Sequence, residues 1–244
     1  MEAVPAPDDG VFETVRVAFG RAVVLDRHLA RLVRGAASLG LPAPDVAQLR
    51  GAVGEVLAAA AIDRGRLRVT WTAVGPVIAV GPAAPVEGPV DVHVVPWPRN
   101  ERSAVGGVKS TSYTANWLAL AEARRHGAGE AIFADTEGRL CEGSGSNVVV
   151  GLGGHLVTPS LITGALGGIG RELVLESTDV VEGELPLSAL HDADEAFLTS
   201  SIRGVQPIRA VDGQPLPRCP GPLTATAARA VAELLAASLD DQRR

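Results

Sequence analysis

The chain has 244 residues and a formal net charge of -6, and 46% of its residues are hydrophobic, 20% charged and 3% aromatic. This composition favours a substantial folded core over disorder, and the length fits one large domain or two of ordinary size, of which we favour two. Negative charge and scarce aromatic rings argue against a nucleic-acid partner, because phosphate binding requires positive charge and unpaired bases stack on aromatic side chains.

Several further classes of protein are not indicated. Cys141 and Cys219 match neither a disulfide framework nor a metal-ligand spacing, and the five histidines are scattered, so we expect no metal site. The N-terminal stretch MEAVPAPDDG is acidic and lacks both a basic segment and an apolar run. Uninterrupted apolar runs stay below the roughly 18 residues that span a membrane. The sequence therefore predicts a soluble, cytoplasmic protein without a membrane partner.

The first elements are a hairpin and two helices. Alternating side chains over residues 11–25 predict two strands around a turn at Phe19 and Gly20. Apolar residues at helical spacing then predict a helix that starts with Asp26 as its N-cap and stops at Gly40. A second, alanine-rich helix is expected over 46–62, with Asp45 as its cap.

Three arginines form a stripe along the first predicted helix. Arg27, Arg31 and Arg34 stand at spacings of four and three residues, so they share one side of the helix. Such a stripe is typical of a solvated helix face, and the residues alone favour that interpretation.

The domain boundary is expected after a group of strands. Residues 66–73, 74–80 and 90–97 read as strands, and prolines, charges and paired glycines then replace the periodicity at 96–107. We therefore predict a small α+β domain at 1–98, a connector at 99–108 and a larger domain of mixed sheet and helices at 109–244.

The second half contains most of the candidate chemistry. A helix is expected at 114–126, followed by a meander of short strands with Glu142 between them. The glycine-rich run at 164–177 leads into a helix, which makes it either a phosphate cradle or a flexible connection. Further strands are expected at 178–182 and 195–200, a hairpin near Asp212 and a final helix.

Two singular residues stand out in the sequence KSTSY. Lys109 is the only lysine beside 21 arginines, and Tyr113 is the only tyrosine. A lysine amine, unlike a guanidinium, can lose its proton and attack a carbonyl to form a Schiff base. Lys109 is therefore either a nucleophile or a surface cation that survived in an arginine-rich composition.

Glu142 also has two interpretations. It follows Cys141 and precedes Gly143 in an apolar strand context. It is either a turn acid that faces water or a buried charge with a specific cationic partner, and the first arrangement is the commoner one in proteins.

Five motifs occur in one order along the chain: GVFETVR at 10–16, HLARL at 28–32, KSTSYTANWLAL from 109, EAIFADTEGRLCEGSGSN ending at 147, and LVTP with LGGIGREL ending at 173. Together they resemble the class IV aminotransferases, the fold-type IV enzymes that depend on pyridoxal 5'-phosphate. The resemblance covers nearly the whole chain and implies a two-domain α+β fold like that of D-amino-acid aminotransferase, small amino substrates and a homodimer. The PWPRNERS, KSTSY and LTSSIRGVQPI runs particularly resemble actinobacterial 4-amino-4-deoxychorismate lyases.

The resemblance implies roles for individual residues. Lys109 would carry the cofactor and act as general base, Glu142 would pair with the pyridine nitrogen, and Tyr113 would lie near the phenolic oxygen. The implied phosphate ligands are Arg31, the backbone around Ile169 and Gly170, and Ser201. The candidates for substrate binding are Arg99, Arg102, Ser201, Ile202 and Arg203.

The chain departs from the family pattern in two places. The family usually has threonine where Gly170 stands, so one hydroxyl contact to the phosphate is missing, which would weaken binding by roughly 1.5–3 kcal/mol unless water replaces it. The sequence also begins almost at GVFE, whereas relatives usually start with a hairpin, which implies a missing sheet edge or an altered dimer contact.

The resemblance leaves three functions open. The first is a lyase that converts 4-amino-4-deoxychorismate to 4-aminobenzoate and pyruvate, in the pathway to folate. The second is an aminotransferase acting between an amino acid and a 2-oxo acid. The third is a non-catalytic binding protein on the same fold, suggested by Gly170 and the short N-terminus.

Overall fold

The computed structural model describes residues 9–86 and 88–241, in which the chain forms two compact units. The first unit is Met1–Pro85, Val108–Tyr113 and Leu235–Arg244, of which 9–85, 108–113 and 235–241 are described. The second is Val86–Gly107 and Thr114–Leu234. All but the last two residues of the acidic stretch MEAVPAPDDG lie outside the described part. In that part of the chain, no helix has the length and hydropathy to cross a membrane.

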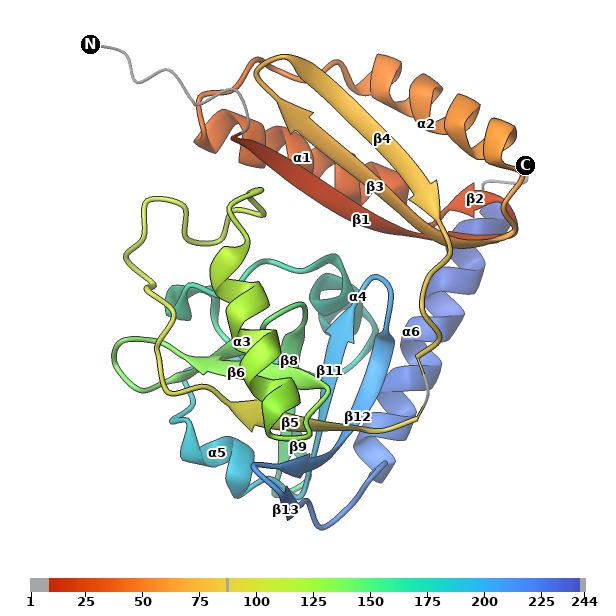
Figure 1. Cartoon of the computed structure of the whole chain (residues 1–244). Helices are drawn as coiled ribbons and strands as arrows, with labels where there is room; N and C mark the ends of the chain where they lie inside the picture. Colours follow the sequence, from red (N-terminus) through yellow and green to blue (C-terminus); the bar gives the residue numbers. More distant parts are fainter. Residues whose placement is uncertain (1–8, 87, 242–244) are drawn as a thin grey trace. The chain divides into compact units, whose positions relative to one another are not determined.

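The first unit is an antiparallel sheet with two helices (Figure 1). Its strands lie in the order β2-β1-β3-β4, and β1 pairs with β3 along its whole length, from Gly10 opposite Thr72 to Ala18 opposite Arg64. The elements are β1 (Gly10–Ala18), β2 (Arg21–Ala22), α1 (Leu25–Ser38), α2 (Val46–Ala60), β3 (Arg64–Thr72) and β4 (Gly75–Gly81).

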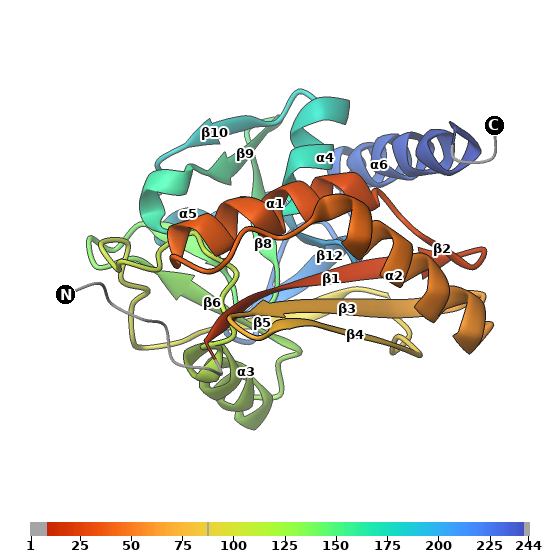
Figure 2. The same ribbon diagram turned by 90° about the horizontal axis from the view of Figure 1, so that it is seen from above.

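Alternation along the strands builds the core of this unit. On β3, Leu67, Val69 and Trp71 are buried, whereas Arg64 and Arg66 on the opposite side are exposed. The buried side of the sheet packs against Leu29 and Leu32 of α1 and against further apolar residues of α2. Both helices therefore lie along the sheet, as Figure 2 shows.

The two helix starts differ in how well they were predicted. Asp45 caps α2 as expected, because its Oδ1 accepts a hydrogen bond from the Gln48 amide at 3.0 Å. The prediction that Asp26 caps α1 is wrong. The helix begins at Leu25 after Val24, whose φ of 47° lies in the left-handed region, and Asp26 lies in the first turn. There its carboxylate pairs with Arg50 of α2.

The second unit is a nine-stranded sheet with helices. Eight strands form the path β10-β9-β8-β11-β12-β5-β6-β7, and β13 pairs with β12. The elements are β5 (Val90–Val94), α3 (Thr114–Arg125), β6 (Glu130–Ala134), β7 (Leu140–Gly143), β8 (Asn147–Leu152), β9 (His155–Pro159), the 3-10 turn Leu161–Thr163, α4 (Ile169–Ser177), β10 (Val181–Gly183), α5 (Ser188–His191), β11 (Glu195–Ser200), β12 (Gly204–Val211), β13 (Gln214–Pro215) and α6 (Pro222–Asp241).

One strand belongs to a different sheet from the one we expected. The strand at Val90–Val94 was grouped with the N-terminal strands, but β5 pairs in parallel with β12 on one side and with β6 on the other. Apolar alternation identifies a strand without identifying its partners. Residues 86–107 accordingly belong to the second unit.

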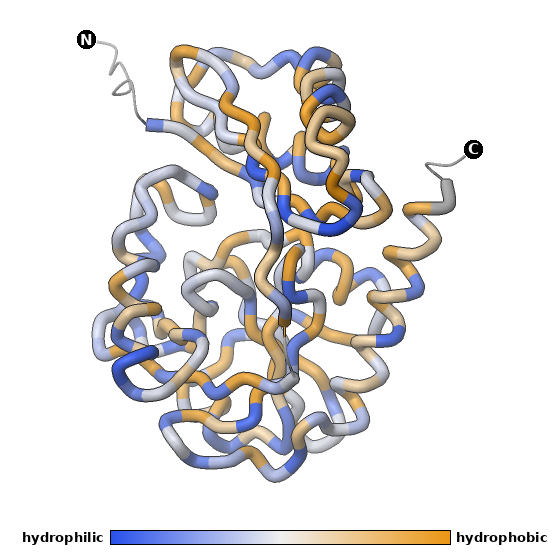
Figure 3. The backbone as a smooth tube through the Cα atoms, turned by 45° about the vertical axis from the view of Figure 1, so that its right-hand side comes forward, coloured by the Kyte–Doolittle hydropathy of each residue, from blue (hydrophilic) through white to orange (hydrophobic). Residues whose placement is uncertain are grey.

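Hydrophobic side chains fill both sides of the second sheet. On one side, residues such as Ile132, Val150 and Leu198 form a core, and on the other, alanines of α3 pack against Phe133 and Cys141. Strands β7 and β8 are buried along almost their whole length, which is typical of a sheet covered on both faces. Along α6, in contrast to these buried strands, hydrophobic and hydrophilic residues alternate, as the colours in Figure 3 show.

Candidate active site

The KSTSY segment is attached to the start of β1. The Phe12 amide donates to the Lys109 carbonyl at 2.9 Å, and the Thr111 amide donates to the Gly10 carbonyl at 2.8 Å. The Thr111 hydroxyl oxygen also accepts from the Gly10 amide at 2.9 Å, and Val11 and Ser110 form an antiparallel bridge. The main chain at Lys109 is therefore held as an addition to the first sheet.

Two aromatic rings surround the Lys109 amine. Nζ lies 4.5 Å from the centroid of the Phe12 ring and 5.6 Å from that of Tyr113, and the two rings meet edge to face at 5.4 Å. The Arg68 guanidinium lies 3.8 Å from the Phe12 centroid, and burial lowers the pKa of Arg68. The structure thus brings Lys109 and Tyr113 together at the Phe12 ring, which also contacts the Arg68 guanidinium.

Arg31 is held by an acid that we did not single out from the sequence. Its Nε and Nη2 donate to the two carboxylate oxygens of Glu13 at 2.7 and 2.6 Å, and His28 Nδ1 lies 2.6 Å from the same carboxylate. Burial would raise the pKa of Glu13, but hydrogen bonds from Arg31 and His28 outweigh it and hold the pKa below its ordinary value. A solvated stripe is therefore the wrong description of Arg31, although Arg34 is exposed.

Glu142 is a buried acid with a cationic partner. It lies in β7 opposite Phe133 of β6, and one of its carboxylate oxygens is 3.3 Å from Arg99 Nη2. The other oxygen accepts from the Leu166 amide at 2.9 Å and from Asn147 Nδ2 at 3.3 Å. The expectation of a turn acid facing water is wrong, and the alternative is confirmed.

Arg99 is held between the Glu142 carboxylate and the Phe133 ring. Its guanidinium carbon lies 4.4 Å from the centroid of Phe133, and its side chain is 22% exposed. Among the described residues, Arg99 Nε has no hydrogen-bond partner. From the sequence we expected Arg99 only as a counter-ion for substrate, and its contact with Glu142 was not foreseen.

Gly170 occupies a place where a side chain does not fit. It follows Ile169 at the start of α4, and a Cβ built on it would lie 2.6 Å from the Thr199 hydroxyl and 3.0 Å from the Ser200 backbone. In the described part of the chain, that hydroxyl is buried without a hydrogen-bond partner. The neighbouring β11 therefore accounts for the glycine, and Thr199 places a hydroxyl beside it.

Restoring a side chain at this position should reduce stability. We expect Gly170→Ala and Gly170→Thr to lower the unfolding free energy by about 1–3 kcal/mol, because the added atoms overlap with β11. The control is Gly51→Ala, in an exposed part of α2 where a Cβ meets nothing within 4 Å. That variant should be neutral or stabilised by up to roughly 1 kcal/mol. Thermal melts that rank Gly170→Ala at or above Gly51→Ala would show that β11 is not the reason for the glycine.

The remaining predicted residues have mixed surroundings. Arg203 Nη2 lies 2.9 Å from the carboxylate of Glu130, which is fully buried, so this arginine already neutralises an internal charge. Arg102 is 76% exposed and pairs with Glu137 at 3.0 Å. Ser201 and Ile202 lie half-buried in the turn after β11.

The candidate residues divide between the two units. Lys109, Tyr113 and Arg31 belong to the first. Those of the second are Arg99, Arg102, Glu142, Ile169, Gly170, Ser201, Ile202 and Arg203.

Together, the sheets and these residues define the class of protein. The Amino-transferase class IV family model matches residues 10–211, so the chain belongs to the class IV aminotransferases and is an enzyme of that family. The predicted family and the two-domain, fold-type IV α+β class are confirmed.

Similar proteins carry several names. The bifunctional aminodeoxychorismate lyase / D-amino acid transaminase of Mycobacterium tuberculosis is 31% identical over 246 residues, covering 87% of this chain and 85% of that protein. D-alanine aminotransferase of Listeria monocytogenes is 31% identical over 242 residues, covering 89% and 83%. A hypothetical aminotransferase from Mycobacterium tuberculosis, solved in a PLP-bound form, has a TM-score of 0.84 at 28% identity and covers 97% and 94% of the two chains.

Proposed function

We propose that this enzyme is a lyase that uses pyridoxal 5'-phosphate to convert 4-amino-4-deoxychorismate to 4-aminobenzoate and pyruvate. The observation that carries the proposal is the placement of Lys109, the sole lysine of the chain, beside Tyr113 on a segment fixed to β1. The name of the relative from Mycobacterium tuberculosis, which includes this lyase activity, supports the choice of substrate.

The residues of the chain suit this cofactor. Its aldehyde requires an amine, which Lys109 offers. Its pyridine nitrogen requires a buried acid, and Glu142, which is only 7% exposed, is such an acid. Its phosphate would be held by Arg31, by the amides at the start of α4 around Ile169 and Gly170, and by Ser201. Thr199 adds a buried hydroxyl next to Gly170 that is unpaired among the described residues, so it would replace the hydroxyl that the family has at that position.

The chain's own groups would then act on the substrate as follows. When bound, the cofactor supplies an electron-withdrawing ring that stabilises negative charge on the carbon beside the substrate amine. Lys109 removes the proton from that carbon, and the C–O bond to the enolpyruvyl group breaks as the substrate ring becomes aromatic. The departing group gains a proton and becomes pyruvate. Tyr113 would orient the cofactor beside Lys109.

Glu142 and Arg99 would act as a pair. The Glu142 carboxylate supplies the negative charge that keeps the ring nitrogen protonated, and Arg99 at 3.3 Å limits the cost of burying that charge. In this role Arg99 positions Glu142. Arg203 faces the buried Glu130, which leaves it less suited than we expected to bind a substrate carboxylate.

Transamination is the second candidate, because the relatives from Mycobacterium tuberculosis and Listeria monocytogenes both carry a transaminase name. It begins with the same proton removal by Lys109, so the same residues serve both reactions. A homodimer and a place in the folate pathway remain parts of this proposal.

The experiment that separates the two reactions omits the keto acid. Purified enzyme is incubated with 4-amino-4-deoxychorismate alone, and pyruvate is measured with a coupled lactate dehydrogenase assay. We expect pyruvate and 4-aminobenzoate in equal amounts. No pyruvate, together with amino transfer from D-alanine to 2-oxoglutarate, would replace the lyase with the transaminase. Neither product would reject both.

A further inference from the structure

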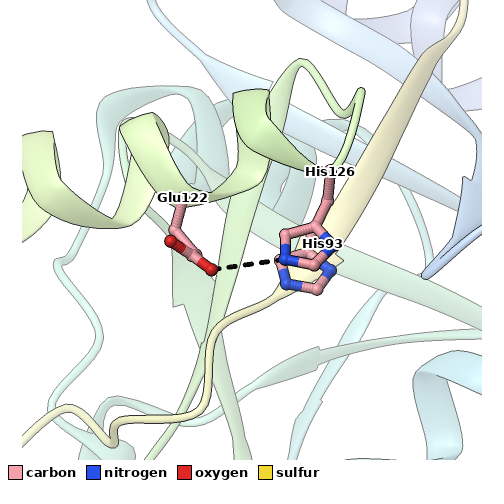
Figure 4. A group of neighbouring side chains, drawn as sticks. All are labelled: His93, Glu122 and His126. Atoms are coloured by element: carbon pink, nitrogen blue, oxygen red, sulfur yellow. Dashed lines mark hydrogen bonds and ion pairs between the residues drawn. The ribbon is translucent and has the colours of Figure 1, made fainter.

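A group of metal-ligating side chains lies in the second unit, apart from the candidate active-site residues. His93 of β5, Glu122 of α3 and His126, just after α3, each offer one ligand atom, and these atoms all lie within 4.8 Å of one another. We call them the His93 cluster, and Figure 4 shows the two imidazoles stacked on each other with the Glu122 carboxylate pointing toward them. From the sequence we expected no metal site, because His93 and His126 are far apart in the chain and only the fold brings them together.

The His93 ring is held by a carboxylate on its other side. Its Nδ1 lies 2.6 Å from Asp212 Oδ1, and the same oxygen accepts from the Val94 amide at 3.0 Å. The Asp212 amide in turn donates to the Val92 carbonyl at 3.0 Å, so Asp212 is fixed to β5 at two points. A neutral His93 that donates from Nδ1 keeps the lone pair on Nε2, as in carboxylate–histidine–metal arrangements.

Glu122 and His126 lie at the C-terminal end of α3. His126 follows the last helical residue, but its amide still donates to the Glu122 carbonyl at 3.2 Å, so the two side chains stay neighbours, and Glu122 Oε1 lies 3.2 Å from His126 Nε2. Glu122 also pairs with Arg125, whose side chain is 71% exposed. An ion pair whose arginine is exposed in this way contributes little to stability, so a more strongly bound cation can replace Arg125 at the carboxylate.

The present arrangement of the rings requires one movement. The two imidazoles are stacked, with centroids 4.0 Å apart and planes 13° from parallel, so their lone pairs do not converge on one point. His126 would be the ring that turns, because its side chain is 53% exposed, whereas the His93 ring is only 16% exposed and is held by Asp212.

We propose that His93, Glu122 and His126 bind a first-row divalent transition metal such as Zn²⁺, with Asp212 as the residue that positions His93. Two imidazole nitrogens and one carboxylate oxygen are typical ligands of Zn²⁺, and they favour it, with Ni²⁺ and Cu²⁺, over Mg²⁺ and Ca²⁺. Three protein ligands leave a further position for water. The metal would join α3 to β5, and this site is independent of the lyase or transaminase reaction.

The test is a titration of the full chain with Zn²⁺ by calorimetry and with Co²⁺ by visible absorption, in a buffer that does not chelate. We expect one metal ion to bind per chain and the Co²⁺ complex to show the visible absorption bands of a four- or five-coordinate ion. His126→Ala should lower the affinity at least about tenfold, and Asp212→Asn, which acts through His93, about 10–100-fold. His126 is exposed, so its loss should leave the fold intact, which circular dichroism checks.

Three controls keep the result specific. His155→Ala removes an exposed histidine outside the cluster, and Cys219→Ser removes the less buried thiol; both should bind as the parent does. Lys109→Ala, which removes the residue proposed to carry the cofactor, should also leave the affinity unchanged. Absence of Zn²⁺ and Co²⁺ binding, or unaltered binding in both His93→Ala and His126→Ala, would overturn the proposal.

Discussion

Replacing Lys109 by arginine should lower kcat by roughly 10²–10⁴-fold while the protein stays folded, because a guanidinium keeps the charge but cannot act as a base. The variant can retain the stacking on Phe12, where Nζ lies 4.5 Å from the ring centroid. The measurement is pyruvate release, or amino transfer if that is the reaction found. A variant as active as the parent would show that Lys109 is not the base.

The single lysine allows a second, direct measurement. Borohydride reduction of the loaded enzyme should fix one cofactor per chain at position 109, and Lys109 is the only lysine that could be labelled. Lys109→Arg should show no labelling. Lys109→Ala should regain part of its activity with a small added amine, because such an amine can replace the missing base. Labelling elsewhere, or none in the parent, would contradict the role of Lys109.

Glu13→Gln should lower the unfolding free energy by about 3–5 kcal/mol near neutral pH, because it leaves Arg31 without its buried counter-charge and weakens the contact with His28. The pKa of Glu13 lies below its ordinary value in the folded protein. Its contribution is therefore complete above the ordinary carboxyl pKa and is lost as the pH falls through the lowered folded value. The difference between parent and variant should shrink on acidification.

Urea unfolding measures this effect in the first unit. Trp71 lies in its core, and substituting Trp97 and Trp117 by phenylalanine leaves Trp71 as the only fluorescent tryptophan. Glu55→Gln, on an exposed position of α2, is the matched control and should unfold as the parent does. Equal midpoints for Glu13→Gln and Glu55→Gln at neutral pH would show that Glu13 and its two partners do not stabilise this unit.

Local patterns predicted most of the elements in this chain. Helix α2 follows from an alanine-rich stretch and from the cap at Asp45 directly before it, so both signals are local. The start of α1 was harder, because the interaction that holds Asp26 comes from Arg50 on another helix. The sheet of β5 was harder still, since its partner β12 follows more than a hundred residues later and pairs Ile208 with Val90.

The site shows the same division between local and distant causes. Lys109 and Tyr113 were found because they are singular residues. Glu13 could have been found, since it shares the inward row of β1 with Val11, Val15 and Val17 and is the only acid there. The cationic partner of Glu142 could not be predicted from the sequence, because Arg99 lies near Glu142 only through the pairing of β6 with β7. The reason for Gly170 also lies elsewhere, in the backbone of β11.

The discontinuous first unit determines which of its contacts are slow to form when the chain folds. This unit combines residues 9–85 with 108–113 and 235–241. The Gly10 amide and the Thr111 hydroxyl, which join its first strand to the Lys109 segment, are 101 residues apart in the sequence. Contacts of such separation require the closure of a long loop and therefore form more slowly than those of a hairpin. We expect the segment that carries Lys109 to reach β1 late in refolding, after the hairpin of β3 and β4 has paired.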